Sequence, residues 1–218
     1  MDERMRAERF HFEEHRECFI IRRGILRTIL GYYLGVEPSR LQFCYGKNEK
    51  TALADTFGKG KVHFNLSHSE GLALYAFTRY REIGVDIEYI RDVPEMKQIV
   101  ERYFSAREKD VFQVLPERKK KEAFFNCWTR KEAFIKSTGD GLSWPLDRFD
   151  VSLVPGEPAR LLRIDGDSKA ASRWLIQDLK SAPGFAAAFA VEGRSWEVHY
   201  WQWADWSTKY LNSKQITG

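Results

Sequence analysis

The order in which helical and strand-like patterns follow one another constrains the fold of this chain most. Apolar residues recur at near-helical spacing from Ala7 to about Leu34, and a second such stripe runs from Lys119 to Ser137. Each stripe is followed by short apolar runs, separated by Gly, Pro, Asp and Ser, that are typical of strands. Helices followed by antiparallel strands, in place of a regular strand-helix alternation, predict an α+β protein.

The patterns also predict element boundaries. We expect one long helix over residues 7–34 and further helices over 95–104, 106–115 and 119–137. We expect strands over residues 41–45, 62–66, 72–78, 83–87, 149–154, 159–164, 174–179, 185–191 and 196–201, with a loop over 46–60.

Length and charge exclude several classes of function. A chain of 218 residues with 43% hydrophobic content can fold as one domain or as two small halves. Its 35 Lys and Arg against 31 Asp and Glu leave a net charge of +4, too small and too interspersed to predict nucleic-acid binding.

Since no stretch approaches the roughly 20 apolar residues of a membrane span, we expect no membrane insertion. Three cysteines without metal-ligand spacing favour reduced thiols and a cytoplasmic location.

Two acidic residues lie two positions apart in the segment Gly84-Val85-Asp86-Ile87-Glu88. A strand would place both carboxylates on one face and the two apolar side chains on the other. Two carboxylates so close repel each other unless a cation neutralises them, and Mg²⁺ prefers one or two carboxylates together with phosphate oxygens. The segment therefore predicts a magnesium site; the alternative is an edge strand with a solvated acidic face.

A helix and a strand end carry further candidates. Glu132 and Lys136 share one helix face in Trp128-Thr129-Arg130-Lys131-Glu132-Ala133-Phe134-Ile135-Lys136, a spacing equally typical of a surface ion pair. In Phe64-Asn65-Leu66-Ser67-His68-Ser69, hydroxyls and an imidazole enter a turn where they could contact a phosphate; the alternative is an exposed histidine in a turn. Nucleophilic catalysis by Ser67 and His68 is not expected, because adjacent strand residues point to opposite faces.

Together these three segments resemble the surfactin-synthetase-activating (Sfp-like) class of 4'-phosphopantetheinyl transferases. The family pattern is a Ser-His turn, then Gly-x-Asp-x-Glu, then Trp-Ser/Thr-x-Lys-Glu-x-x-x-Lys, and the order and spacing match over residues 67–136. The resemblance, which extends from about Ala7 to Trp201, implies two similar α/β halves related by a pseudo-twofold axis. These would comprise residues 1–95 and 96–203, followed by a tail over 204–218.

The resemblance also implies roles for individual residues. Asp86, Glu88 and Glu132 correspond to the metal carboxylates, and Lys136 to a lysine that contacts the pyrophosphate. The residues with which we expect coenzyme A to be bound are Ser67, His68, Lys50, Arg23, Lys131 and Lys136. The candidate catalytic residues are Glu132, Lys136, Glu108 and His68; Glu108 enters through a Phe-Ser-x-x-Glu segment of the family, matched here at residues 104–108.

Two segments depart from the family pattern. Lys50 lies where the family has Gly-Lys-Pro, but Glu49 and Thr51 replace the Gly and the Pro. Family members usually carry a longer N-terminal segment with basic contacts to the 3'-phosphate of coenzyme A. Either Arg4, Arg6, Arg23 or Arg27 makes that contact here, or the first lobe is incomplete and coenzyme A binds weakly.

The implied reaction is attack by a serine hydroxyl of an acyl, peptidyl or polyketide carrier protein on the β-phosphate of coenzyme A. The expected cofactor is Mg²⁺, and the general base is Glu132, Glu108 or a metal-bound water. Arg107, Lys109 and residues 118–121 are candidate docking residues for an acidic carrier. A monomer is expected, because a chain with two halves has less need to build its site between subunits. Two rivals stay open: a magnesium-dependent nucleotide pyrophosphohydrolase, and a non-catalytic protein that binds coenzyme A or a carrier.

Overall fold

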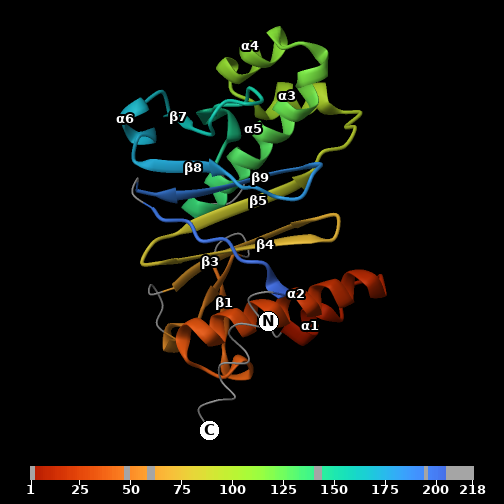
Figure 1. The fold of residues 1–218 in the computed structure, drawn as a ribbon, viewed down its shortest axis with the longest axis vertical. Helices are drawn as coiled ribbons and strands as arrows, with labels where there is room; N and C mark the ends of the chain where they lie inside the picture. Colours follow the sequence, from red (N-terminus) through yellow and green to blue (C-terminus); the bar gives the residue numbers. More distant parts are fainter. Residues whose placement is uncertain (1–2, 47–49, 58–61, 140–143, 194–195, 205–218) are drawn as a thin grey trace. The chain divides into compact units, whose positions relative to one another are not determined.

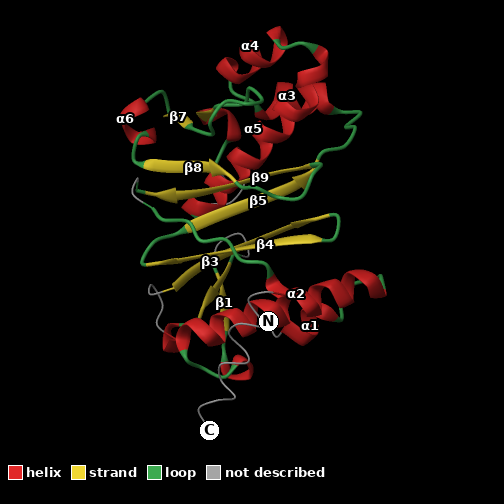
Figure 2. Ribbon diagram, viewed as in Figure 1, coloured by secondary structure: helices red, strands yellow, loops and turns green. Residues whose placement is uncertain are grey.

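The computed structural model describes residues 3–46, 50–57, 62–139, 144–193 and 196–204 (Figure 1). The chain divides into two compact units, one comprising residues 1–41 and 195–218 and the other residues 42–194. The helices α3, α4 and α5 follow one another directly, and the strand pairs of the described residues are antiparallel (Figure 2). This arrangement confirms the predicted α+β class.

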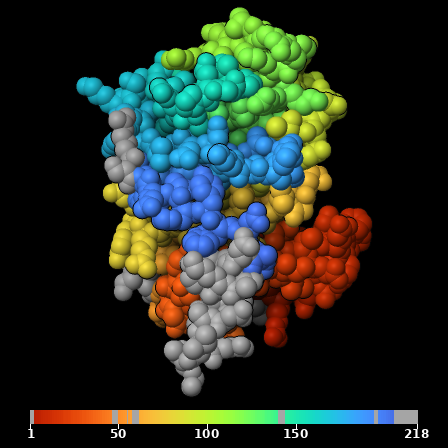
Figure 3. All heavy atoms as spheres, in the orientation of Figure 1, coloured from red at the N-terminus to blue at the C-terminus, as the bar shows by residue number. Residues whose placement is uncertain are grey.

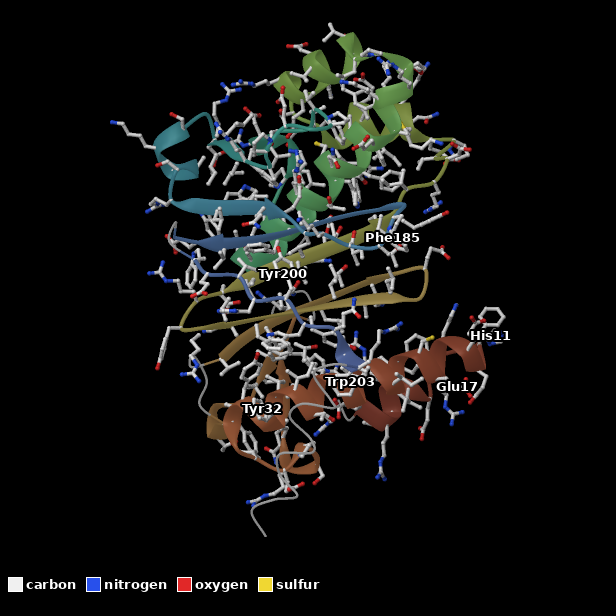
Figure 4. The ribbon with its side chains drawn as sticks, viewed as in Figure 1. His11, Glu17, Tyr32, Phe185, Tyr200 and Trp203 are labelled. Atoms are coloured by element: carbon white, nitrogen blue, oxygen red, sulfur yellow. The ribbon has the colours of Figure 1, made fainter. Side chains whose placement is uncertain are left out.

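The first unit contains α1 (Glu3–Ala7) and α2 (Glu13–Leu34), where the sequence predicted one continuous helix. The predicted continuity from residue 7 was wrong, because the chain turns between the two helices. This turn brings the rings of Phe10 and Phe19 into contact, with centroids 5.4 Å apart. In one helix, positions nine residues apart would be separated by about 13 Å along the axis. In Figure 4, His11 lies just before the start of α2, Glu17 lies near its N-terminal end and Tyr32 near its C-terminal end.

A predicted strand of the first unit is also wrong. Residues 196–202 adopt irregular backbone, and Tyr200, Trp201 and Trp203 are exposed (Figure 4). Aromatic residues raise β-propensity, but a strand also needs a neighbouring strand to pair with, which sequence spacing does not reveal.

The second unit holds the strands. β1 (Phe43–Tyr45) pairs with β2 (Thr51–Leu53), β3 (Val62–Ser69) with β4 (Leu72–Arg79), and β6 (Phe149–Val151) with β7 (Leu161–Ile164). β5 (Ile83–Tyr89) pairs with β9 (Phe185–Glu192), which also pairs with β8 (Trp174–Asp178). Phe185, labelled in Figure 4, packs edge-on against Tyr89 across the β5–β9 pair. β2 lies within the region that the sequence predicted to be a loop.

The helices of the second unit are α3 (Met96–Tyr103), α4 (Ala106–Val114), α5 (Glu117–Thr138) and the short α6 (Ser168–Ala171). α4 begins with a capping box, in which Ser105 and Glu108 each accept a hydrogen bond from the other's backbone N–H. Large buried aromatics, among them Phe104, Phe134 and Phe149, fill the core between these helices and the β5–β9–β8 sheet. In Figure 3, the atoms of α4, α5 and the residues that follow them, coloured green through cyan, form one continuous surface.

The order of elements repeats along the chain. α2 and α5 both have 22 residues and end at a glycine in the left-handed region, Gly35 and Gly139. Each is followed by a short antiparallel pair and then by a second antiparallel pair, β3–β4 after α2 and β8–β9 after α5. This repetition supports the two-half description, while the proposed boundary at residue 95 stays a prediction.

Candidate active site

A close crossing of α5 over β5 builds the site. A Cβ added to Gly84 would lie 2.0 Å from the Ala133 carbonyl oxygen and 2.5 Å from the Ser137 backbone nitrogen. Only glycine therefore fits where α5 touches this strand. On β9, residues 186–188 and 190 are alanines, and Ala188 and Ala190 lie opposite Asp86 and Gly84. Small residues on both strands let α5 approach the sheet.

The same face of β5 carries the two acidic residues, as the sequence predicted. Asp86, two residues after Gly84, is only 3% exposed, which excludes the alternative of a solvated acidic face for this residue. Its Oδ1 lies 2.6 Å from Lys136 Nζ, which reaches back from α5. Its Oδ2 is buried and has no hydrogen-bond partner within the described ranges. Asp86 thus keeps one acceptor atom for a group that the protein itself does not supply.

Asp86 lies near enough to Glu88 and Glu132 for its charge to raise the pKa of both. Burial raises the pKa of Glu88, and the charge of Asp86 raises it further. Burial likewise raises the pKa of Glu132; the Lys136 ammonium opposes that shift, and Asp86 and Glu88 add to it. Glu132 and Lys136 therefore do not form an isolated surface ion pair, the alternative left open by the sequence. They belong to a cluster of three carboxylates and one ammonium.

This donor set fits a hard divalent cation. The three carboxylates repel one another, one buried oxygen of Asp86 has no partner in the described part of the chain, and Mg²⁺ favours carboxylate oxygens. Among the described residues, no group of three or more His, Cys, Asp or Glu side chains is arranged so that it could hold a metal ion by itself. Mg²⁺ does not require one, because it usually takes one or two carboxylates and completes its shell with substrate phosphates and water.

Ser67 and His68 point to opposite faces of β3. Ser67 is buried and donates a hydrogen bond of 2.8 Å to Asp86 Oδ1, so it belongs to the acidic group. His68 is exposed on the other face. The structure thus brings Ser67, but not the His68 ring, to the carboxylates.

Glu108 and Lys131 pair with each other inside the second unit. Lys131 Nζ lies 2.8 Å from Glu108 Oε2, and each side chain is 1% exposed. Lys131 also donates to the carbonyls of Leu146 and Phe149, both at 2.7 Å, while Glu108 accepts from the Val151 backbone at 2.8 Å. This internal ion pair joins α4, α5 and β6, and the structure gives no support to roles for Glu108 as base or for Lys131 as a coenzyme A contact.

Lys50 and Arg23, the other expected coenzyme A contacts, have protein partners. Lys50 Nζ lies 2.6 Å from Glu82 Oε2 and donates to the Lys136 carbonyl at 2.6 Å, which places it at the C-terminal end of α5. Arg23 belongs to the first unit, where its Nε lies 2.9 Å from Glu3 Oε1. Glu49, which alters the family pattern beside Lys50, lies outside the described residues.

Three contacts of the site were not predicted: Asn65 accepts a hydrogen bond from the Val85 backbone at 2.9 Å, Ser69 donates one to Glu88 Oε2 at 3.3 Å, and Gly84 makes room for α5. A signal for the first two was present: Asn65, Ser67 and Ser69 alternate with period two, and so share one face of a strand. The predicted strand stopped at residue 66, so this face was not recognised; β3 in fact continues to Ser69.

Comparison with known proteins decides the family. A family model described as the 4'-phosphopantetheinyl transferase superfamily matches residues 82–190. The 4'-phosphopantetheinyl transferase HetI of Nostoc sp. (strain PCC 7120) is 42% identical over 202 residues, which cover 93% of this chain and 82% of that protein. The chain belongs to the 4'-phosphopantetheinyl transferase superfamily.

Other members of the 4'-phosphopantetheinyl transferase superfamily are more distant. The 4'-phosphopantetheinyl transferase Sfp of Bacillus subtilis is 30% identical over 152 residues, 70% of this chain and 65% of that protein. The crystal structure of Thermotoga maritima holo-[acyl-carrier-protein] synthase aligns with a TM-score of 0.41 and 23% identity, over 52% of this chain and 64% of that one. In the described ranges of this transferase, no helix is both long and apolar enough to cross a membrane.

Proposed function

We propose that this protein transfers 4'-phosphopantetheine from coenzyme A to a serine of an apo carrier protein and releases adenosine 3',5'-bisphosphate. The observation that carries the proposal is the convergence of Asp86, Glu88, Glu132 and Lys136 where α5 crosses β5. Three carboxylates beside one ammonium are suited to phosphoryl transfer, in which the protein mainly positions groups and balances charge.

In this proposal the metal ligands are Asp86, through its buried Oδ2, together with Glu88 and Glu132. Mg²⁺, when bound, neutralises negative charge on the pyrophosphate oxygens of coenzyme A. The raised pKa values of Glu88 and Glu132 support this assignment, because burial and, to a smaller extent, the neighbouring carboxylates disfavour their charged forms when no cation is present.

Lys136 and Glu132 act on the leaving group and on the attacking serine, respectively. The serine oxygen of the carrier forms a bond to the β-phosphorus while the bond from that phosphorus to the bridging oxygen of adenosine 3',5'-bisphosphate breaks. Lys136, whose side chain is 28% exposed, stabilises charge on the leaving phosphate. Glu132, which lies beside Lys136 and the other two carboxylates, accepts the serine proton.

The carrier protein is proposed to dock on basic residues of α4 and α5. Arg107 and Arg118 are exposed, whereas Lys109 lies 3.5 Å from Glu101, Lys120 lies 2.8 Å from Glu117, and Lys121 pairs with Asp92. An acidic carrier would have to compete with these exposed local ion pairs, which are individually weak. The monomeric state and cytoplasmic location stay predictions from the sequence.

The test is mass spectrometry of an apo carrier protein incubated with this protein, coenzyme A and Mg²⁺. We expect the carrier to gain one phosphopantetheine, and EDTA to abolish the gain. Release of adenosine 3',5'-bisphosphate without any carrier would instead identify a pyrophosphohydrolase. Binding of coenzyme A without transfer to acyl, peptidyl or polyketide carriers would identify a binding protein.

A further inference from the structure

β3 and β5 lie side by side in the second unit, but within the described residues they belong to different sheets (Figure 1). Side chains of β3 take the place of a backbone ladder between them. The backbone N–H groups of Val85, Ile87 and Tyr89 donate to the side-chain oxygens of Asn65 at 2.9 Å, Ser67 at 3.4 Å and Ser69 at 3.1 Å. The constant offset of 20 residues shows that the two strands run in the same direction.

Two of these three contacts continue to a carboxylate. Ser67 Oγ donates to Asp86 Oδ1 at 2.8 Å, and Ser69 Oγ donates to Glu88 Oε2 at 3.3 Å. Each serine thus binds the carboxylate of one residue of β5 and the backbone N–H of the next. The third contact, at Asn65, lies beside Gly84, which has no side chain to bind.

The hydrogen-bonding capacity of Ser67 is fully used by this arrangement. A hydroxyl has one donor and two acceptor positions. The donor goes to Asp86, and the acceptors receive the Ile87 backbone N–H at 3.4 Å and Lys136 Nζ at 3.3 Å. Because Oδ1 of Asp86 is held by Ser67 and Lys136, the orientation of the carboxyl group is fixed, and with it the position of Oδ2, which has no partner among the described residues.

We propose that Ser67 and Ser69 are positioning residues that orient Asp86 and Glu88 for the metal ion. This inference rests on the proposed function, since it takes both carboxylates to be metal ligands. Groups that hydrogen-bond to metal ligands fix the orientation of those ligands, and their loss commonly weakens metal binding about 10- to 100-fold. The spacing Asn65-x-Ser67-x-Ser69 then matches Gly84-x-Asp86-x-Glu88 position by position along two strands that run in the same direction.

Mn²⁺ binding to the full chain, followed by the EPR signal of the free ion, tests the proposal without relying on activity. Thermal unfolding without metal, measured on the same variants, reports stability separately. We expect Ser67→Ala and Ser69→Ala each to weaken Mn²⁺ binding by about 10-fold or more. Ser69→Thr, which keeps the hydroxyl, should bind Mn²⁺ as the wild type does.

The matched control is Asn65→Ala, which removes one contact between the strands but none to a carboxylate. It should lower the melting temperature and leave the Mn²⁺ affinity unchanged.

Three outcomes would overturn the proposal. If Ser67→Ala and Ser69→Ala bind Mn²⁺ as the wild type does, while Asp86→Asn loses binding, the metal ligands are correct and the positioning role is wrong. If Asn65→Ala weakens Mn²⁺ binding as much as the serine variants do, the serines act only by joining the strands. Unchanged binding in Asp86→Asn would instead refute the metal assignment of the proposed function, and the positioning role with it.

Discussion

Glu88 and Glu132 stand next to Asp86 in surroundings that disfavour their charged forms. Burial is the larger cause in each case, and the neighbouring carboxylates add to it. A group with these properties is costly to the metal-free protein at neutral pH and useful to a protein that binds a cation. Proton and metal ion therefore compete for the same oxygens.

This competition predicts a pH dependence of metal binding. As pH falls from neutrality towards the ordinary carboxyl range, Glu88 and Glu132 should take up protons earlier than exposed glutamates, and Mg²⁺ affinity should fall with them. For the metal-free protein the sign is opposite: because both pKa values are raised by folding, the stability that these groups contribute is greatest at acid pH and is lost as pH rises through the raised values.

The melting temperature without Mg²⁺ measures the second effect, and its rise on addition of Mg²⁺ measures the first. The rise should be larger at neutral than at mildly acid pH, since binding to the native state stabilises it by an amount that grows with the affinity. In the Glu88→Gln/Glu132→Gln double variant the rise should be small and independent of pH. A pH-independent rise in the wild type would contradict the assignment of these two residues.

At the scale of elements, the site depends on how closely α5 lies on β5. Gly84→Ala should force the helix away from the strand, because the added Cβ would meet backbone atoms, the nearest being the Ala133 carbonyl oxygen at 2.0 Å. We expect a loss of about 1–3 kcal/mol or more in the free energy of unfolding, measured with urea, and loss of transfer activity as Glu132 and Lys136 shift.

Gly24→Ala is the matched control for that prediction. Gly24 is exposed in α2, and nothing lies within 4 Å of the position of its added Cβ. The substitution should stabilise the protein by about 0.5–1 kcal/mol. Equal stability of the wild type and Gly84→Ala would show that α5 is not pressed against β5.

The pair formed by Glu108 and Lys131 should matter for stability. Lys131→Met leaves the Glu108 carboxylate buried without its partner, and we expect it to cost about 3–5 kcal/mol. Glu108→Gln/Lys131→Met should recover much of that loss, because no uncompensated charge remains. Urea unfolding checks both. If Lys131→Met unfolded like the wild type and lost only coenzyme A affinity, the role expected from the family resemblance would be correct instead.

Across the whole molecule, the sequence predicted what depends on local pattern. The α+β class, the three consecutive helices α3 to α5 and the placement of Asp86 and Glu88 on one face of a strand follow from periodicity. Contacts between distant segments do not. The Glu108–Lys131 pair, the contacts from β3 to β5 and the close approach at Gly84 depend on tertiary packing, so a motif could name Glu108 without showing that its carboxylate lies in the core.

The most direct test of the account is the rate at which wild type and Glu132→Gln convert an apo carrier protein to its phosphopantetheinyl form, followed by mass spectrometry with saturating coenzyme A and Mg²⁺. Glu122→Gln, an exposed change on the same helix, is the control. We expect Glu122→Gln to match the wild type and Glu132→Gln to be about 10²- to 10⁴-fold slower while still folded. Near-normal turnover of Glu132→Gln would contradict its assignment as metal ligand and base together.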